Sequence, residues 1–227
     1  MVPVIVLLAI ACAALGTMFV RSTGRKKGLK AAVLKGLTTC CCIAVGLISI
    51  FHTVDKRFAV LVVIGIFFGF LGDEFLAMRY IHPDKFKICF ASGSAAFLIG
   101  HIFYIIALLG LVPSAWKIAI PVTIVLLIFE YYNSKRHKID MNRLFVPGGL
   151  YMSVICFMCG CAIGSAVLGF DPGTLVFAIA GISFVASDTL LSVQYFGDTR
   201  SERNGHILHI TYFLAQFLIG LTPLLIK

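Results

Sequence analysis

Four acidic side chains lie inside long apolar segments of this sequence, where a charged group is costly to bury. They are Asp73, Glu74, Glu130 and Asp188, and the whole chain contains only ten acidic residues. Placing such a group at the centre of a membrane-spanning helix costs about 2.5–3.5 kcal/mol, so a buried acid usually faces the protein interior and has a function. Paired carboxylates in different surroundings are what general acid–base chemistry uses. The alternative for Asp73 and Asp188 is a structural role, in which they bond across helices to Ser, Tyr or Lys.

Other polar residues accompany the acids in the apolar segments, and most of them reach a similar depth. At about 1.5 Å per helical residue, positions counted from the segment ends convert directly into depths. Asp73 and Asp188 lie in the second half of their segments. Polar residues in the first half of segments that run the other way reach nearly the same level. His101 lies near the middle of its segment. Six helices are thus predicted to place polar groups in one slab, which includes Lys35, His101, Tyr104, Tyr151, Ser183, Ser187, Tyr212 and Gln216.

The composition predicts that the chain uses lipid as its solvent. Of its 227 residues, 60% are hydrophobic and 13% are charged, and the mean hydropathy is +1.02. A soluble domain is about 45–50% apolar and about 25% charged, and a helix needs about 20 apolar residues to cross the hydrocarbon core. We predict an all-α bundle of eight transmembrane helices, forming a single integral membrane domain over residues 1–227 without a soluble domain. The predicted spans are about 1–20, 31–51, 58–78, 87–110, 115–133, 145–169, 173–196 and 206–226.

The basic residues of the predicted loops favour one orientation. The odd-numbered loops carry 14 Lys and Arg residues and the opposite side carries 4, and cytoplasmic loops are enriched in these residues. Both termini are therefore expected outside, and the polar slab in the cytoplasmic half of a bacterial inner membrane. The net charge of +9 reflects this loop bias, so no nucleic-acid partner is expected. The odd-loop residues are Arg21, Arg25, Lys26, Lys27, Lys30, Arg79, Lys85, Lys87, Lys135, Arg136, Lys138, Arg143, Arg200 and Arg203.

Several of these polar residues also have simpler interpretations. Glu130 and Lys35 lie close enough to the inner interface to extend their charged ends toward the headgroups. Glu74 is turned about 100° from Asp73 on a helix, so the two cannot face one centre. His101 alone is more typical of a hydrogen-bonded core residue than of a metal ligand. No metal site is predicted at the three cysteines of one span either, because their spacing does not bring them to one point; they are Cys156, Cys159 and Cys161.

A set of short motifs follows the polar residues along the chain. They are LKGLTT with Lys35 and Thr38, FLGDEFLAM with Gly72 and Asp73, FLIGHIFYIIAL with His101 and Tyr104, SFVASDTLLSVQYF with Ser187 and Asp188, and TYFLAQFLI with Tyr212 and Gln216; PGGLYM, with Tyr151, fits less closely. Their order and spacing over residues 34–219 resemble the YhhN-like lysoplasmalogenase family of multi-pass membrane hydrolases. The chain departs from the family pattern at Gly36, where the family commonly has proline.

The resemblance implies hydrolysis of the alkenyl (vinyl) ether bond of lysoplasmalogens, giving a fatty aldehyde and glycerophosphocholine or glycerophosphoethanolamine. We take Asp73 and Asp188 as the catalytic acid–base pair, and expect Lys35 and Arg79 to hold the substrate phosphate near the interface. The expected partners are lysophospholipid and bilayer lipids, without a metal or other cofactor. The hydrocarbon chain is expected deeper, among Phe and Leu side chains. The residues expected to position substrate or water are His101, Tyr104, Tyr151, Ser187, Tyr212 and Gln216, with Glu130 as an accessory residue.

The chemistry of a vinyl ether suits two carboxylates. The bond resists base but yields to acid: protonation of its β-carbon creates an oxocarbenium-like cation, water adds, and the hemiacetal collapses. One carboxyl group must donate the proton and an ionised one must stabilise the cation and orient water; the sequence leaves open which aspartate is the acid. A proton-coupled transporter also uses buried Asp, Lys and His, and a lipid-binding membrane protein without turnover is a third alternative.

Overall fold

Eight long helices make up the described part of the chain, which comprises residues 1–23, 28–141 and 144–227 of a computed structural model. Each of the eight is long and apolar enough to cross a membrane. The loop cations Arg25, Lys26, Lys27 and Arg143 lie outside the described residues. The helices are α1 (Val2–Thr23), α2 (Gly28–His52), α3 (Lys56–Ala77), α4 (Phe86–Leu111), α5 (Trp116–Arg136), α6 (Phe145–Gly169), α7 (Pro172–Phe196) and α8 (Glu202–Leu221), with short 3-10 turns η1 (Met78–Tyr80), η2 (Pro83–Lys85), η3 (Pro113–Ala115) and η5 (Thr222–Leu224).

A long apolar helix lies at each of the eight predicted spans, with ends that differ by a few residues. Helix α8 differs most, because it begins at Glu202 whereas hydropathy places the start of the last span at about residue 206. The reason is a polar cap: the Ser201 hydroxyl accepts a hydrogen bond from the Asn204 amide at 3.0 Å, which starts the helix before its apolar part. Asp55 caps α3 and Asp171 caps α7 in the same way.

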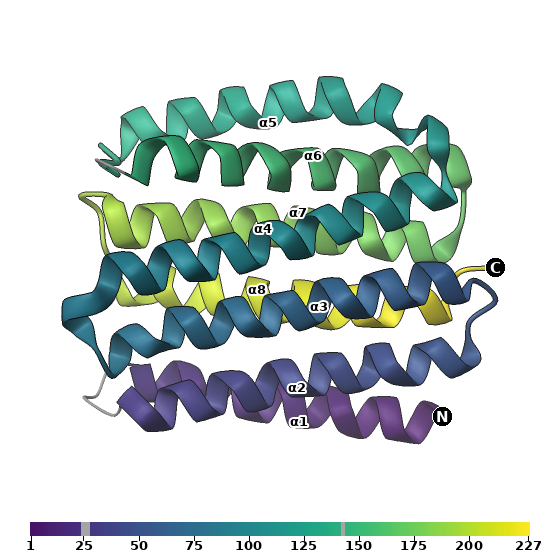
Figure 1. Ribbon diagram of the computed structural model, residues 1–227, viewed down its shortest axis with the longest axis horizontal. Coiled ribbons are helices and arrows are strands. Elements are labelled where there is room, and N and C mark those ends of the chain that lie inside the picture. Colours follow the sequence, from purple (N-terminus) through teal and green to yellow (C-terminus); the bar gives the residue numbers. More distant parts are fainter. Residues whose placement is uncertain (24–27, 142–143) are drawn as a thin grey trace.

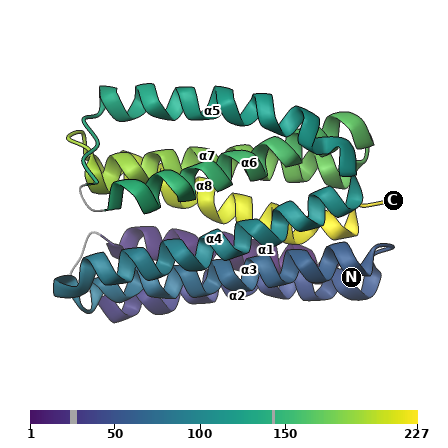
Figure 2. The ribbon, with the colours of Figure 1, turned by 45° about the horizontal axis from the view of Figure 1, so that its top comes forward.

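The helices form two groups with α8 between them. Figure 2 shows α1–α4 on one side of the bundle and α5–α7 on the other. Both termini lie at one end of the bundle (Figure 1), and the C-terminal ends of α1, α3, α5 and α7 lie at the opposite end. In the most apolar 18-residue stretch of α1 and of α5, 17% of the residues are buried, compared with 39–56% in the other six helices. These two helices are therefore peripheral, and the interior is built by the other six.

The most extensive helix pairing in the bundle is between α3 and α4, and glycines permit its close approach. A Cβ added at Gly100 would lie 2.8 Å from the Gly65 carbonyl oxygen, and one at Gly93 would lie 3.1 Å from the Gly72 carbonyl oxygen. On α3 itself, Gly65 and Gly72 leave room for rings of α4, and Gly69 leaves room for Gln216 of α8. Small residues commonly permit such close approach between membrane helices. The glycine ridge of α3 therefore seats side chains of the polar interior as well as a neighbouring backbone.

Candidate functional site

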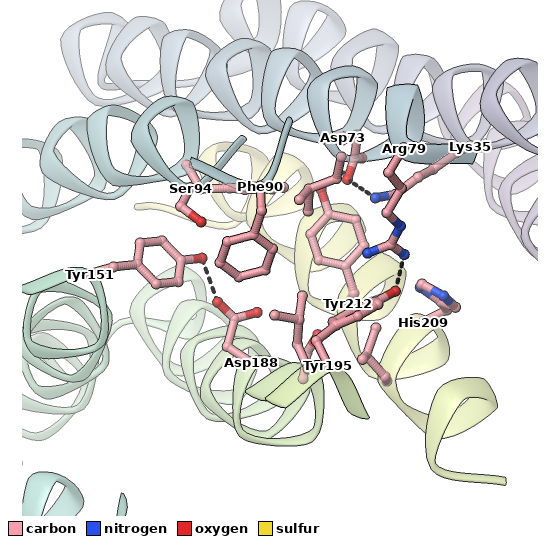
Figure 3. Close-up of a pocket in the computed structure, with 15 residues that line it drawn as sticks. Lys35, Asp73, Arg79, Phe90, Ser94, Tyr151, Asp188, Tyr195, His209 and Tyr212 are labelled. Carbon is pink, nitrogen blue, oxygen red and sulfur yellow. Dashed lines mark hydrogen bonds and ion pairs between the residues drawn. The ribbon is translucent and has the colours of Figure 1, made fainter. Parts of the chain in front are cut away.

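A polar cavity lies between the two groups of helices, toward the end of the bundle that carries the loop after α3. Its volume is about 30 Å³, which is room for about two water molecules at about 10–15 Å³ each. Figure 3 shows its two carboxylates on different sides, Asp73 from α3 and Asp188 from α7. The lining residues are Lys35, Asp73, Leu76, Arg79, Phe90, Ser94, Phe97, Tyr151, Ser187, Asp188, Leu191, Tyr195, Leu208, His209 and Tyr212.

Asp73 is fully buried and receives donors from two other helices. The Lys35 ammonium of α2 lies 2.8 Å from Asp73 Oδ1. The Thr39 hydroxyl, one turn further along α2, donates to Oδ2 at 2.5 Å, and the Tyr212 hydroxyl of α8 donates to the same oxygen at 2.8 Å. A cation and two hydroxyl donors thus surround this carboxylate. Asp73 therefore forms a buried ion pair and joins α2, α3 and α8.

The hydrogen bonds continue from Asp73 toward the middle of the bundle. The Gln216 amide donates to the Tyr212 hydroxyl at 3.0 Å, and the Tyr104 hydroxyl donates to Gln216 Oε1 at 3.3 Å. Gln216 and Tyr212 are one turn apart on α8, whereas Tyr104 comes from α4. Tyr104 and Gln216 do not line the cavity. They support Tyr212, and through it Asp73, from outside the cavity.

Asp188 has different surroundings. It is 5% exposed, and its Oδ2 accepts a hydrogen bond from the Tyr151 hydroxyl of α6. Neither ion pair of the described residues includes it, since these join Lys35 to Asp73 and Lys138 to Asp198. The preceding hydroxyl, Ser187 Oγ, is buried and has no hydrogen-bond partner within the described ranges. A buried carboxyl group that faces one hydroxyl and no paired cation is suited to carry a proton.

Basic side chains lie on the loop side of the cavity. Arg79, from η1, stacks its guanidinium 4.0 Å from the centre of the Tyr195 ring and also donates to the Tyr195 hydroxyl. His209 of α8 lines the same side and contacts Phe19 edge to face, with ring centres 4.8 Å apart. Figure 3 shows Arg79, Tyr195 and His209 together on the side of Lys35, away from Tyr151. This side of the cavity is suited to an anionic group.

Besides Tyr104 and Gln216, two more predicted site residues, His101 and Glu130, do not line the cavity. His101 packs against Phe184 and Tyr151, with ring centres 4.6 and 6.0 Å apart; both its nitrogens are buried and find no hydrogen-bond partner in the part of the chain described. Glu130, on the peripheral helix α5, accepts a hydrogen bond from Thr189 of α7. Glu74 points away from the cavity: a Cβ added at Gly36 would overlap its carboxylate. Gly36 therefore makes room for Glu74.

Several residues that build this site were not predicted from the sequence. Thr39, and not its neighbour Thr38, bonds Asp73; Thr38 donates to the Leu34 carbonyl of its own helix. Phe90 and Ser94 carry no ionisable group, and hydropathy gives no reason to select them. His209 lies three residues before Tyr212 and so shares its helix face, a spacing from which it could have been predicted. No group of three or more His, Cys, Asp or Glu residues in the described ranges is arranged to hold a metal ion.

The fold and cavity define the class of protein: a multi-pass membrane protein with a buried polar site at one end of a helical bundle. Comparison with protein families assigns it further. The model of the YhhN family matches residues 30–222, and the chain belongs to this family. The match includes every residue that lines the cavity. The family is associated with hydrolase activity. No curated protein and no solved structure matches the chain.

Proposed function

We propose that the protein is a lysoplasmalogenase, which hydrolyses the vinyl ether bond of 1-alkenyl lysophospholipids. The observation that carries this proposal is that two buried aspartates with different surroundings line one cavity in a YhhN-family chain. An acid-labile bond needs one carboxyl group that holds a proton and one that stays ionised. The contacts of the two aspartates supply that difference.

Asp188 is assigned as the proton donor. In the first step its carboxyl proton goes to the β-carbon of the vinyl ether, and the electrons of the double bond form the new C–H bond. The oxocarbenium-like cation that results lies beside a newly formed Asp188 carboxylate, which stabilises it. Water then adds to the α-carbon and returns a proton to Asp188. The hemiacetal collapses to a fatty aldehyde and the free hydroxyl of the glycerophospho-alcohol, so that one water is consumed for each ether bond broken.

Asp73 is assigned as the member of the pair that stays ionised. Its contacts with one ammonium and two hydroxyl groups hold a negative charge at the cavity wall, which suits a group that stabilises positive charge and orients water. It also holds the Lys35 ammonium and the Tyr212 hydroxyl at the cavity wall. Ser187 Oγ, buried at the cavity without a partner among the described residues, provides a hydrogen-bonding group for the attacking water.

Lys35 and Arg79 are assigned to the substrate phosphate. Both line the cavity, and Arg79 comes from the turn that follows α3, at the expected membrane surface. A lipid whose phosphate lies there extends its glycerol backbone toward Asp188. A volume of about 30 Å³ admits water but no lipid, so substrate must displace side chains of the wall when it binds.

The loop charges support an orientation in which this end of the bundle is cytoplasmic. We further propose the bacterial inner membrane as the location, with both termini outside. A reporter fused after Lys227 tests the orientation: we expect signal from a periplasmic reporter, and signal from a cytoplasmic reporter would contradict it.

The test of the proposed function is a turnover assay with purified protein in detergent micelles. We expect aldehyde release from 1-alkenyl lysophospholipid and none from the matched ester-linked lysophospholipid, because an ester is not activated by protonation at carbon. A transporter or a passive lipid-binding protein would release no aldehyde, since micelles offer no second compartment. Equal cleavage of the ester-linked lipid would contradict the vinyl ether mechanism.

A further inference from the structure

A second, apolar recess adjoins the polar cavity. It has a volume of about 150 Å³ and lies between α4, α6 and α7. Its lining includes small and aliphatic residues of α4 and α6, among them Ala91, Ala95, Leu98 and Leu150. The recess and the polar cavity share five wall residues: Phe90, Ser94, Tyr151, Asp188 and Leu191. Asp188 is therefore reached from a polar side and from an apolar side.

The recess opens toward lipid on the outside of the bundle. Ala91, Ala95 and Leu150 are exposed side chains within membrane-spanning helices. Leu98 lies 12 positions after the first residue of α4, which places it about 18 Å along the helix at about 1.5 Å per residue. The recess thus extends from the loop end of the bundle, at Met141 and Leu144, past Asp188 to Leu98. A hydrocarbon chain that leaves the site through it runs in the direction of the surrounding lipid chains.

We propose that the hydrocarbon chain of a single-chain phospholipid occupies this recess between α4 and α6, while its phosphate lies on the Lys35 and Arg79 side of the polar cavity. The inference rests on the proposed function and fixes the direction in which the substrate lies. In a 1-alkenyl lipid the hydrocarbon begins at the vinyl ether itself. The point where polar and apolar spaces meet is therefore where the reacting bond belongs, and Asp188 is there.

Phe90 separates the two spaces. Its ring is 8% exposed and packs edge to face against Phe196, with ring centres 5.0 Å apart. Figure 3 shows it between the Tyr151–Asp188 pair and Tyr212. Since Phe90 lines both spaces, a movement of this one side chain would join them. Substrate binding is accordingly expected to move Phe90.

A larger groove on the outside of α1 and α8 is the competing site for the chain. Its volume is about 500 Å³, and its lining includes Ala9, Ala13, Gly16, Ile210 and Phe217. It shares no lining residue with the polar cavity and contains no carboxylate. A chain bound there has no continuous lined path to Asp188, so size alone does not make this groove the substrate site.

Photo-crosslinking tests the two sites without requiring turnover. The probe is a 1-O-alkyl lysophosphatidylcholine with a diazirine in its chain, which lacks the alkenyl double bond and is not hydrolysed by the proposed route. We expect labelled peptides from residues 91–98 of α4 and 147–152 of α6, and competition by unlabelled 1-alkenyl lysophospholipid. Labelling confined to residues 9–20 and 210–217, or labelling without competition, would overturn the proposal.

A matched pair of variants tests the same point by kinetics. Ala95→Leu narrows the recess and Ala13→Leu narrows the outer groove, and both alanines are exposed helical residues. We expect Ala95→Leu to raise KM for a long-chain substrate by about tenfold and KM for a short-chain substrate by less. Ala13→Leu should leave both KM values unchanged. The reverse pattern assigns the chain to the outer groove and refutes the inference.

The two experiments separate this inference from the function on which it rests. If wild-type protein releases no aldehyde, the proposed function fails, and crosslinking still shows where a lysophospholipid binds. If aldehyde is released while labels and KM effects fall on α1 and α8, the function stands and the recess is wrong. If Ala95→Leu does not fold, the wild-type crosslinking result decides.

Discussion

Asp73 and Asp188 line one cavity from different helices, yet one is held by many groups and the other by few. Asp73 pairs with Lys35 and accepts hydrogen bonds from Thr39 and Tyr212. Asp188 accepts one from Tyr151. The Asp73 side also continues into a second layer of hydrogen bonds through Gln216, whereas the Asp188 side adjoins an apolar recess.

This difference separates two tasks that a buried carboxylate can have. A cation and several donors stabilise the charged form, so Asp73 contributes to holding three helices together as well as to the electrostatics of the cavity. A carboxyl group with one hydroxyl partner and apolar neighbours can hold and release a proton. We therefore expect substitutions on the Asp73 side to change both stability and activity, and substitutions at Asp188 to change activity almost alone.

The largest effect is expected for Asp188→Asn. Removing a general acid commonly costs about 10²–10⁴ in rate, and here the same group also accepts the proton of water, so we expect kcat to fall by about 10³-fold. Asparagine keeps the size of the side chain and can still bond Tyr151, so the thermal midpoint in detergent should change little. The measurement is aldehyde release under saturating substrate.

Asp198→Asn is the control for this substitution. Asp198 lies in the loop after α7 and is partly exposed, and its ion pair with Lys138 spans 3.6 Å. Because Asp198 does not line the cavity, loss of its charge should leave kcat within about twofold. Stability should change by at most about 1 kcal/mol, since the ion pair is exposed. An Asp188→Asn enzyme as active as this control would refute the assignment of the acid.

Substitutions of Asp73 and Lys35 should lower the stability of the protein. Asp73→Asn leaves the buried Lys35 ammonium without its counter-charge, and breaking one partner of a buried ion pair costs about 3–5 kcal/mol. We expect a large fall in the thermal midpoint together with a loss of activity of about 10²-fold. Lys35→Met should be similarly destabilising. The double variant Lys35→Met/Asp73→Asn should be more stable than either single variant, because no unpaired charge remains.

Additive losses in this double variant would mean that the Lys35–Asp73 pair is not coupled as the 2.8 Å distance indicates. Equal thermal midpoints for Asp73→Asn and Asp188→Asn would remove the contrast between the two sides altogether. Both outcomes are readable by thermal denaturation in detergent, independently of substrate.

The fold could be predicted from the sequence because lipid leaves few alternatives. A segment that spans the hydrocarbon core must satisfy its backbone hydrogen bonds internally, so an apolar run of sufficient length becomes a helix. The depth of a residue in the membrane can also be predicted, since each residue advances a helix by a fixed distance. That is why Lys35, Asp73, Tyr151, Asp188 and Tyr212 could be predicted at one level, and all five line one cavity.

What could not be predicted is the direction in which each residue points around its helix axis. Thr38 and Thr39 have almost the same depth, but they are about 100° apart, and only packing of α2 against α3 decides that Thr39 meets Asp73. His101 lies in a predicted motif yet faces Phe184 and Tyr151. The residues that meet a given helix face depend on how the whole bundle packs. The hydropathy of one segment does not carry that information.

Substitutions of the two tyrosines that contact the aspartates should have moderate effects on kcat, and they test the same comparison. Tyr151→Phe removes the hydroxyl that Asp188 accepts from, whereas Tyr212→Phe leaves Asp73 with Lys35 and Thr39. Asp188 becomes a charged carboxylate as it gives up its proton, and a hydrogen bond to a charged group is worth about 1.5–3 kcal/mol. We expect kcat to fall by about tenfold for Tyr151→Phe and by about threefold for Tyr212→Phe, measured as aldehyde release. A larger loss for Tyr212→Phe would reverse the assignment of the acid.

The smallest effect is expected at Glu130, a buried acid outside the cavity. Its carboxylate accepts a hydrogen bond from Thr189 and joins the peripheral helix α5 to α7. Glutamine can accept the same bond, so Glu130→Gln should leave kcat within about twofold and lower stability by about 1 kcal/mol at most. Glu130→Leu, which leaves Thr189 without this acceptor, should lower the thermal midpoint without lowering kcat further. A fall in kcat as large as that of Tyr151→Phe would instead make Glu130 part of the proton path to Asp188, and the division between one anchored and one proton-carrying aspartate would have to include a third acid.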